Sequence, residues 1–294
     1  MKVACQLSKG YLVSPGSKKQ LYFVEGGGSL VTIDQTERFT MQNGVPILLP
    51  SGSDYGAYVA SSQKMIEEYT LAALQQQQSI KNKARKFLIR DYPSRASRGA
   101  YSATFGKMTE GNLCLSIGGG PSRISNLLTN LNVAAFPGVD VVGDGHCLPY
   151  RDECVDAIYC DAVLEHLRDP YLAVSEMARV LRKGAKAFVI TPFMQQYHGY
   201  PGHYQNYTLT GHQELFRTHG FHIDAAGVSV GPTWVLINVV SVFINTYFPP
   251  RTKKIAQAAW LVATMGLRPL DLRLANHKNA HVLASTTFVL ARKE

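Results

Sequence analysis

Residues 113–128 read LCLSIGGGPSRISNLL, and this stretch decides the fold. A short apolar run at 113–117 meets three consecutive glycines, and a segment with helical spacing follows them. A glycine-rich turn between a strand and a helix lets a ligand approach the backbone closely, and it aims helix N–H groups at that ligand. We therefore predict a strand at 113–117, a nucleotide-binding turn at the glycines, and a helix from Ser122 or Arg123 to about Leu128.

Strands and helices are predicted to keep alternating beyond this stretch. Asp169 and Pro170 indicate a helix start, because a carboxylate caps the first turn and proline suits its first position. Gly184 is predicted to end that helix. The alternation predicts an α/β fold with a doubly wound, Rossmann-like, mainly parallel sheet, in which ligands bind at the carboxyl ends of the strands. The other predicted strands are residues 131–134, 139–142, 157–160, 186–191, 221–230 and 281–292.

Three regions are predicted along the 294 residues. Residues 1–56 have turn and strand signals and form a small β-rich module. Residues 57–110 are helical in character and form a linker or lid that carries many basic side chains. Residues 111–294 form the main domain, with a helical insertion, apolar and basic, at about 232–280.

Charge and cysteine content limit the class of protein. Lys and Arg number 30 against 21 Asp and Glu, which gives a formal net charge of +9. This charge leaves open an anionic partner, either a membrane surface or nucleic acid, and also a soluble basic enzyme. The five cysteines include no CxxC pair, so a reducing, cytoplasmic compartment is expected rather than a disulfide framework. The longest apolar stretch, 228–248, is interrupted by Gly, Pro and Asn and falls short of a membrane span.

The blocks GDGHCLPYRDECVDAIYCDAVLEHLRDP at 143–170 and RVLRKGAKAFVITPF at 179–193 resemble the class I S-adenosylmethionine-dependent methyltransferases. The resemblance covers roughly 111–230 and implies S-adenosylmethionine as cofactor. In that family the glycine turn passes the methionine part, an acid after the second strand holds the ribose, and an acid after the third holds adenine. Two positions depart from the pattern: Ser116 and Asn132 stand where acids are usual. The implied cofactor-binding residues are Gly118, Gly119, Gly120, Asn132, Asp144, Gly145 and Cys160.

The N-terminal region carries a second resemblance, to the short zinc-ribbon-like module that precedes many small-molecule methyltransferases. It ends in NGVPILLP at 43–50, close to the module's DGIPxLLP. Of the four thiols only Cys5 remains, and Ser8, Thr32 and Gln35 stand in for the others. A closed structural zinc site usually needs four ligands of this kind. We therefore expect no metal ion in this module or elsewhere in the protein, and the module must be stabilised by packing on the rest of the chain.

Candidate reactive residues follow the fifth strand, in PFMQQYHGYPGHYQNYT at 192–208. This block resembles a methyltransferase subgroup pattern, although the run of His and Tyr is also compatible with a structured loop. Methyl transfer is an in-line displacement that depends mainly on positioning, and a hydroxyl acceptor is helped by a general base. The expected catalytic residues are His198, His203 and His166. The expected substrate-binding residues are Tyr204, Tyr207 and Trp234.

The function expected from these features is methylation, at oxygen or nitrogen, of a small acceptor with an apolar or aromatic, even lipid-linked, body. Two alternatives are an RNA or DNA methyltransferase and a non-catalytic scaffold. The N/D-P-P-Y motif of amino-methylating nucleic-acid enzymes is replaced by Cys-Asp-Ala-Val at 160–163, which argues against nucleic acid. The insertion at 232–280 is expected to line a pocket or to contact a membrane surface or a second copy of the chain.

Overall fold

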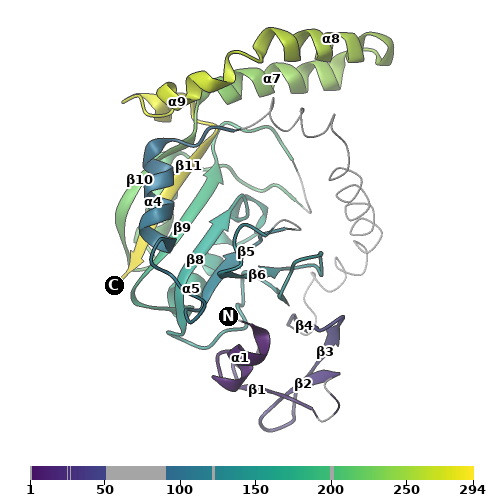
Figure 1. The fold of residues 1–294 in the computed structure, drawn as a ribbon, viewed down its shortest axis with the longest axis vertical. Helices are drawn as coiled ribbons and strands as arrows, with labels where there is room; N and C mark the ends of the chain where they lie inside the picture. The colour runs from purple at the N-terminus through teal and green to yellow at the C-terminus, as the bar shows by residue number, and fades with distance from the viewer. Residues whose placement is uncertain (1, 25, 27, 51–90, 121–122, 199–201) are drawn as a thin grey trace.

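The structure is a computed structural model that describes residues 2–24, 26, 28–50, 91–120, 123–198 and 202–294. Within these residues one sheet runs through the molecule, with its strands in the order β1-β2-β3-β4-β7-β6-β5-β8-β9-β11-β10. Figure 1 shows the sheet between the N-terminal module and a long helical hairpin at the opposite end. The predicted Rossmann-like α/β fold is confirmed.

The centre of the sheet is parallel. Its strands pair so that Ile117 faces Leu131 on one side and Cys160 on the other. The side chains of β5, β6 and β7 are buried throughout, as expected of parallel strands that are covered on both faces. The strands are β5 (Cys114–Ile117), β6 (Leu128–Asn132), β7 (Val141–Gly143), β8 (Val155–Asp161) and β9 (Leu181–Pro192).

The helix predicted at 122–128 is wrong. The described residues 123–127 form turns, and β6 begins at Leu128. The spacing of Ile124, Leu127 and Leu128 resembles one helix face, but Leu128 pairs with Cys114 and is buried in the sheet. Only ten residues separate β5 from β6, and strand pairing takes precedence over local helical spacing. The strand predicted at 131–134 begins three residues earlier, as β6, and the strand predicted at 139–142 begins two residues later, as β7.

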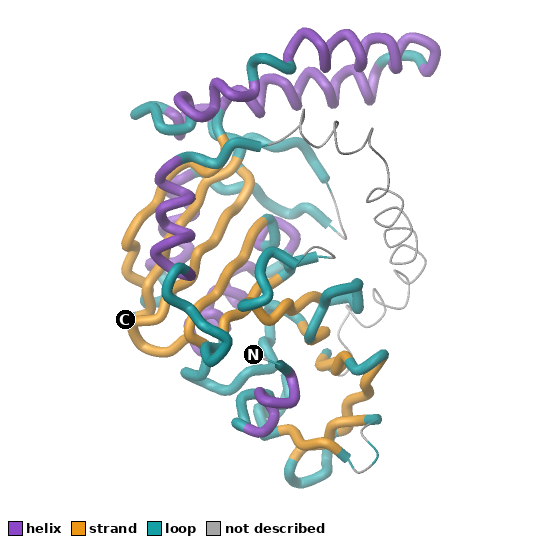
Figure 2. Tube along the Cα trace, in the orientation of Figure 1, coloured by secondary structure: helices purple, strands orange, loops and turns teal. Residues whose placement is uncertain are grey.

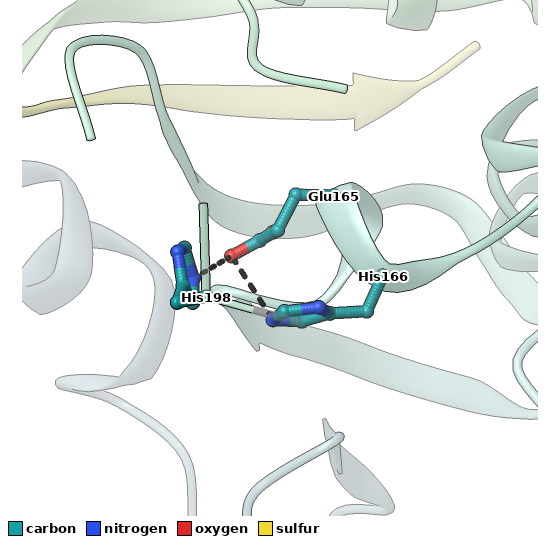
Figure 3. A group of neighbouring side chains, drawn as sticks. All are labelled: Glu165, His166 and His198. Carbon is teal, nitrogen blue, oxygen red and sulfur yellow. Dashed lines mark ion pairs between the residues drawn. The ribbon is translucent and has the colours of Figure 1, made fainter. Parts of the chain in front are cut away.

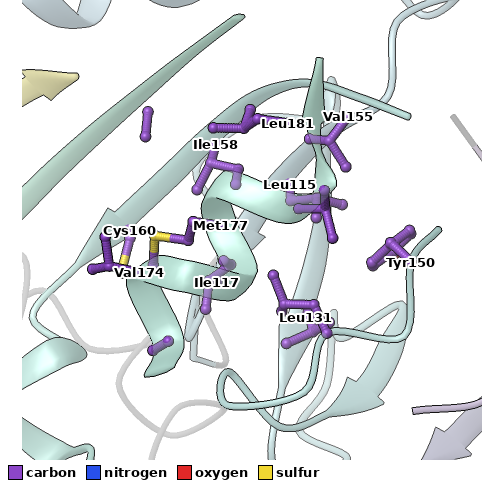
Figure 4. Packing of buried hydrophobic residues seen from close by; sticks show 14 of the residues in the cluster. Leu115, Ile117, Leu131, Tyr150, Val155, Ile158, Cys160, Val174, Met177 and Leu181 are labelled. Carbon is purple, nitrogen blue, oxygen red and sulfur yellow. The ribbon is translucent and has the colours of Figure 1, made fainter. Parts of the chain in front are cut away.

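Helices cover both faces of the sheet. On one face α5 (Pro170–Val180) and α6 (Leu209–Arg217) pack against alternate residues of the strands, such as Ile117, Ile158 and Cys160 (Figure 4). On the other face α4 (Arg95–Phe105) packs against the intervening residues, including Tyr159 and Phe188. The core therefore lies in two layers separated by the sheet.

The start of α5 is confirmed and its predicted end is wrong. The Asp169 side chain accepts a 2.9 Å hydrogen bond from the backbone N–H of Leu172, as a helix cap does. The helix ends at Val180, and Gly184 lies inside β9 with φ of +76°. The β8–β9 register jumps at this point, from Val155 opposite Leu181 to Ala157 opposite Lys186. Gly184 therefore accommodates a β-bulge in β9 and does not end the preceding helix.

Two antiparallel strands complete the far edge. The strand β10 (Phe221–Val230) has the predicted bounds, and it pairs with β11 (Thr286–Lys293), which in turn pairs with β9. The predicted strand start at 281 is wrong, because residues Ala280–Leu283 form a 3-10 turn, η3.

The N-terminal module extends the same sheet. Its last strand pairs in parallel with β7, and Gln6 donates a 2.8 Å hydrogen bond to Thr129 Oγ1 on β6. Tyr150 Oη donates to Gln6 Oε1, so a buried polar network links the module to the main domain. Packing on the rest of the chain thus holds the module in place. Its elements are α1 (Val3–Ser8), β1 (Leu21–Phe23), β2 (Ser29–Thr32), β3 (Arg38–Gln42) and β4 (Val45–Leu48).

The insertion is helical, as predicted. The helices α7 (Pro232–Tyr247) and α8 (Pro250–Thr264) form a hairpin, followed by the 3-10 turn η2 (Arg268–Leu270) and by α9 (Asp271–Leu274) (Figure 2). Among the described helices, none is both long and apolar enough to cross a membrane. Several large apolar side chains of the hairpin are exposed, and the expected membrane or dimer contact stays a prediction. Of the helical segment predicted at 57–110, residues 57–90 lie outside the described residues.

Candidate active site

The turn after β5 can accommodate only glycine at two positions. Gly118 has φ of +69°, and a Cβ there would lie 2.3 Å from Cγ2 of Val163. A Cβ on Gly119 would lie 2.5 Å from Oδ1 of Asn130. Gly120 also has a positive φ, of +59°, but faces open space. Gly118 and Gly119 are thus packed against neighbouring side chains, whereas Gly120 faces open space. A ligand can therefore approach the backbone of residues 118–120, which we call the cofactor cradle.

Two predicted polar residues end the next two strands. Asn132, at the end of β6, is buried and accepts a 3.3 Å hydrogen bond from the backbone N–H of Ala134. Asp144 follows β7 and is 4% exposed. Its Oδ1 accepts a 2.9 Å bond from the backbone N–H of His146 and lies 2.7 Å from Nδ1 of the same residue. The sequence analysis missed His146, which holds this carboxylate in place.

A second missed residue is Asp161, at the carboxyl end of β8. Its carboxylate lines a cavity of about 670 Å³ between α4, the sheet and α7. Asp161 is exposed toward the cavity, yet desolvation by the surrounding protein raises its pKa to about 6, while a 2.8 Å hydrogen bond from Tyr159 Oη counteracts part of this rise. The sequence signal that could have identified Asp161 is its position at the carboxyl end of a central strand. The apolar wall of the cavity includes Tyr101, Tyr159, Phe188, Ile190, Val230 and Trp234.

The three histidines predicted as catalytic are brought together. The ring centroids of His166 and His198 lie 5.1 Å apart, and those of His198 and His203 lie 4.4 Å apart. His203 uses both ring nitrogens: Nδ1 accepts from the backbone N–H of His198, and Nε2 donates to Asn206 Oδ1 at 2.6 Å. Glu165, fully buried, lies beside His166 and His198 (Figure 3). The Glu165 carboxylate raises the pKa of His198.

The remaining predicted residues have varied surroundings. Tyr204 is half exposed, and its Oη accepts a 3.1 Å hydrogen bond from Arg168 Nε. Tyr207 is partly buried against the core, and Trp234 lines the cavity beside Asp161. Cys160 is fully buried near Val174 and Met177 (Figure 4), so its thiol does not reach the open edge. Gly145 lies against Leu167.

Comparison with known families finds one match that includes both the glycine turn and Asp144. The family model described as a methyltransferase domain matches residues 115–189. The chain is thus similar to methyltransferases over residues 115–189. S-adenosylmethionine is the cofactor predicted from the sequence. The observed features fit that cofactor, because the methyltransferase domain combines an open glycine cradle with a buried carboxylate, Asp144, at a neighbouring strand end.

Similarity to individual proteins is partial. An uncharacterized 37.1 kDa protein in transposon TN4556 of Streptomyces fradiae is 42% identical over 58 residues, which span 19% of this chain and 17% of that protein. Phosphoethanolamine N-methyltransferase 2 of Haemonchus contortus, solved with S-adenosyl-L-methionine, is 16% identical, with a TM-score of 0.42, and the match covers 71% of this chain and 55% of that one. Geranyl diphosphate C-methyltransferase of Streptomyces coelicolor is 10% identical, with a TM-score of 0.41 and coverages of 67% and 78%.

Proposed function

We propose that this methyltransferase methylates a small acceptor with an apolar or aromatic body, bound in the cavity beside Asp161. The observation that carries the proposal is the register of the two central strands. Ile117 of β5 faces Cys160 of β8, so the next residues, Gly118 and Asp161, leave neighbouring strand ends. The cofactor cradle and the cavity acid are therefore adjacent, which is the arrangement that methyl transfer requires.

The cavity suits a small acceptor. Its volume of about 670 Å³ lies within the range of small-molecule pockets, which are roughly 300–1,000 Å³ and mostly apolar with a few polar groups. Aromatic side chains from α4, β8, β9 and α7 supply the apolar wall. Ser97, Ser102 and Gln195 add hydroxyl and amide groups that can orient the acceptor. A wall of this composition favours an aromatic or apolar body over a sugar.

We assign the proton-accepting role to Asp161. A group with a pKa of about 6 is mostly ionised at neutral pH, and it can accept the proton that a hydroxyl or amine loses on methylation. S-adenosylmethionine supplies an activated methyl group, so the chain's own tasks are to orient the acceptor, to exclude water and to receive that proton. The product is then an O- or N-methylated acceptor.

The histidines fit the role of general base less well. Both ring nitrogens of His203 are already engaged in hydrogen bonds. The Nε2 atoms of His166 and His198 each lie 3.7 Å from Glu165 Oε1. We infer that these histidines organise the loop between β9 and α6 above the cofactor edge, and that they do not remove the acceptor's proton.

A cavity-filling variant tests the proposal. Ser102 lines the cavity, whereas the adjacent Ala103 is exposed and does not. Methyl transfer from labelled S-adenosylmethionine would be measured with a panel of phenols, aromatic amines, sugars and RNA. We expect transfer to a phenol or aromatic amine, with KM raised at least ~10-fold in Ser102→Phe, because the lost volume excludes the acceptor, and unchanged in the control Ala103→Phe. Transfer to RNA alone, or equal KM in both variants, would contradict the proposal.

A further inference from the structure

We propose that Glu165, His166 and His198 bind a divalent transition-metal ion at the carboxyl edge of the sheet. The three residues come from two segments, the 3-10 turn η1 (Leu164–His166) after β8 and the loop after β9. Figure 3 shows the Glu165 carboxylate between the two imidazole rings. Each residue offers one ligand atom, and the three atoms all lie within 4.8 Å of one another.

The separations suit a shared cation. Glu165 Oε1 lies 3.7 Å from His166 Nε2 and 3.7 Å from His198 Nε2. Bond lengths of about 2.0–2.2 Å at tetrahedral angles place neighbouring ligand atoms roughly 3.4 Å apart. The rings are nearly perpendicular, at 88°, and the Nε2 atom of each ring lies near the same carboxylate oxygen. Side-chain shifts of a few tenths of an ångström would bring each of the two oxygen–nitrogen pairs to this spacing.

The hydrogen bonds of the two histidines leave the facing nitrogens free to act as ligands. His166 Nδ1 lies 2.5 Å from the carbonyl oxygen of Gly202, and His198 Nδ1 lies 2.9 Å from that of Gln196. Because a carbonyl only accepts, both Nδ1 atoms must donate, and the hydrogen-bond network thereby assigns the tautomers. Each Nε2 then faces the carboxylate, as a lone pair in a neutral ring or as an N–H in a protonated one. Metal-ligating histidines are oriented in this way by carbonyl partners.

Glu165 gives an independent indication of a cation. Its side chain is fully buried, and neither carboxylate oxygen has a hydrogen-bond partner among the described residues. Burial of a carboxylate without such partners is costly unless a positive charge lies next to it. Neutral rings would present two Nε2 lone pairs to the carboxylate, a repulsion that either protonation of His198, whose pKa the carboxylate raises, or a cation relieves. A metal ion between them removes this conflict.

The donor set selects the class of ion. Two imidazoles and a carboxylate suit Zn²⁺, Mn²⁺ or Fe²⁺, whereas Mg²⁺ and Ca²⁺ prefer oxygen ligands alone. Three protein ligands leave coordination positions open for another group. The site lies close to the glycine turn, because Val163, two residues before Glu165, packs against Gly118. If the proposed acceptor reaction is correct, an open coordination position on the metal can hold the acceptor's oxygen or nitrogen. A metal ion here would overturn the sequence-based expectation that the protein holds none, which rested on the missing thiols of the N-terminal module.

Metal titration of the full chain tests the site. The protein would be stripped with chelator and titrated with ZnCl₂, MnCl₂ and MgCl₂ by calorimetry, with bound metal counted by elemental analysis. We expect about one Zn²⁺ per chain and no saturable Mg²⁺ binding. Glu165→Gln and His198→Gln should each weaken Zn²⁺ binding by more than ~100-fold, because each removes one of only three ligands. Two controls should retain it: His222→Gln, an exposed histidine on β10, and Cys5→Ser, which removes a thiol outside the core.

The outcomes separate this site from the methyltransferase proposal. Absence of saturable Zn²⁺ binding in the parent protein, or equal binding in Glu165→Gln, would overturn the metal site. Visible absorption of the Co²⁺-substituted parent protein provides a second measurement that needs no variant to fold, and an absorption typical of hexaaqua Co²⁺ would count against the site. Cofactor affinity of the stripped protein, measured in the same calorimeter, reports on the cofactor cradle alone. Cofactor binding without metal binding would therefore refute only the inference made here.

Discussion

The phenol of Tyr159 donates a 2.8 Å hydrogen bond to Oδ2 of Asp161, two residues further along β8. Alternate residues of a strand share one face, so both side chains enter the cavity covered by α4. Desolvation by the surrounding protein raises the pKa of Asp161, and the phenol opposes this rise by stabilising the carboxylate. Asp161 is therefore about half ionised at mildly acidic pH, near 6.

Replacement of the cavity acid should remove most of the turnover. In Asp161→Asn we expect kcat to fall ~10²–10⁴-fold, the usual contribution of a general base, while cofactor affinity stays within about twofold. Steady-state kinetics with the best acceptor and calorimetry with S-adenosylmethionine measure the two effects. Full activity in Asp161→Asn would show that positioning alone drives the reaction.

The pH dependence of the reaction should report the Tyr159–Asp161 pair. Because the base must be ionised, kcat/KM should rise with pH through about 6 in the parent protein. Tyr159→Phe removes a hydrogen bond that favours the carboxylate, so the pKa of Asp161 should increase and the midpoint should move up by about 1–2 pH units. A pH–rate profile of the two proteins checks this. An unchanged midpoint in Tyr159→Phe would show that the pH dependence is not caused by ionisation of Asp161.

Gly118 should tolerate no side chain unless Val163 is shortened. Gly118→Ala places a Cβ 2.3 Å from Val163 Cγ2 and keeps a positive φ, so we expect about 2–4 kcal/mol of destabilisation and weaker cofactor binding. The double variant Gly118→Ala, Val163→Ala removes the clash and should recover part of the stability measured by urea unfolding. If the double variant is no more stable than the single one, steric contact with Val163 is not the cause.

His212 should make folding stability depend on pH. It is fully buried, its Nδ1 lies 3.1 Å and 3.0 Å from the hydroxyl oxygens of Thr191 and Thr287, and burial lowers its pKa to about 3. The unfolded chain therefore binds a proton more readily than the folded one. This contribution to stability is complete above about pH 6.5, and it is lost as the pH falls toward 3, by roughly 1.4 kcal/mol per pH unit.

Urea unfolding between pH 7 and 4 measures this dependence. His212→Leu should be less stable at pH 7, because it loses the hydroxyl contacts, and should show a flatter decline toward acid. The exposed control His222→Gln should keep the parent slope. If His212→Leu declines as steeply as the parent protein, another group causes the acid sensitivity.

The sheet could be predicted from the sequence because its signals are local. Apolar runs marked β5, β8 and β9, and Asp169 with Pro170 marked the start of α5 correctly. The failed predictions, at 122–128 and at Gly184, both depend on pairing with strands distant in sequence. A helix-like spacing and a terminating glycine carry no information about a register shift between β8 and β9.

The site could be predicted only in part. The sequence located the glycine turn and Asp144, because each follows a strand within a known pattern. It missed Asp161, whose proposed role depends on the cavity that it lines together with residues of α4 and α7. It also missed the convergence of Glu165 with His198, because a contact across 33 positions depends on how the loop after β9 folds back over η1.

Cofactor binding is the most direct test of the central claim, that this chain uses S-adenosylmethionine through its glycine turn and Asp144. Calorimetric titration should show one site per chain for S-adenosylmethionine and for its demethylated product. Asp144→Ala should weaken both by about 1–3 kcal/mol, the cost of losing one partner of a buried polar contact, while the exposed control Asp152→Ala should bind as the parent does. Absence of binding by the parent protein, or equal affinity in Asp144→Ala, would contradict the account.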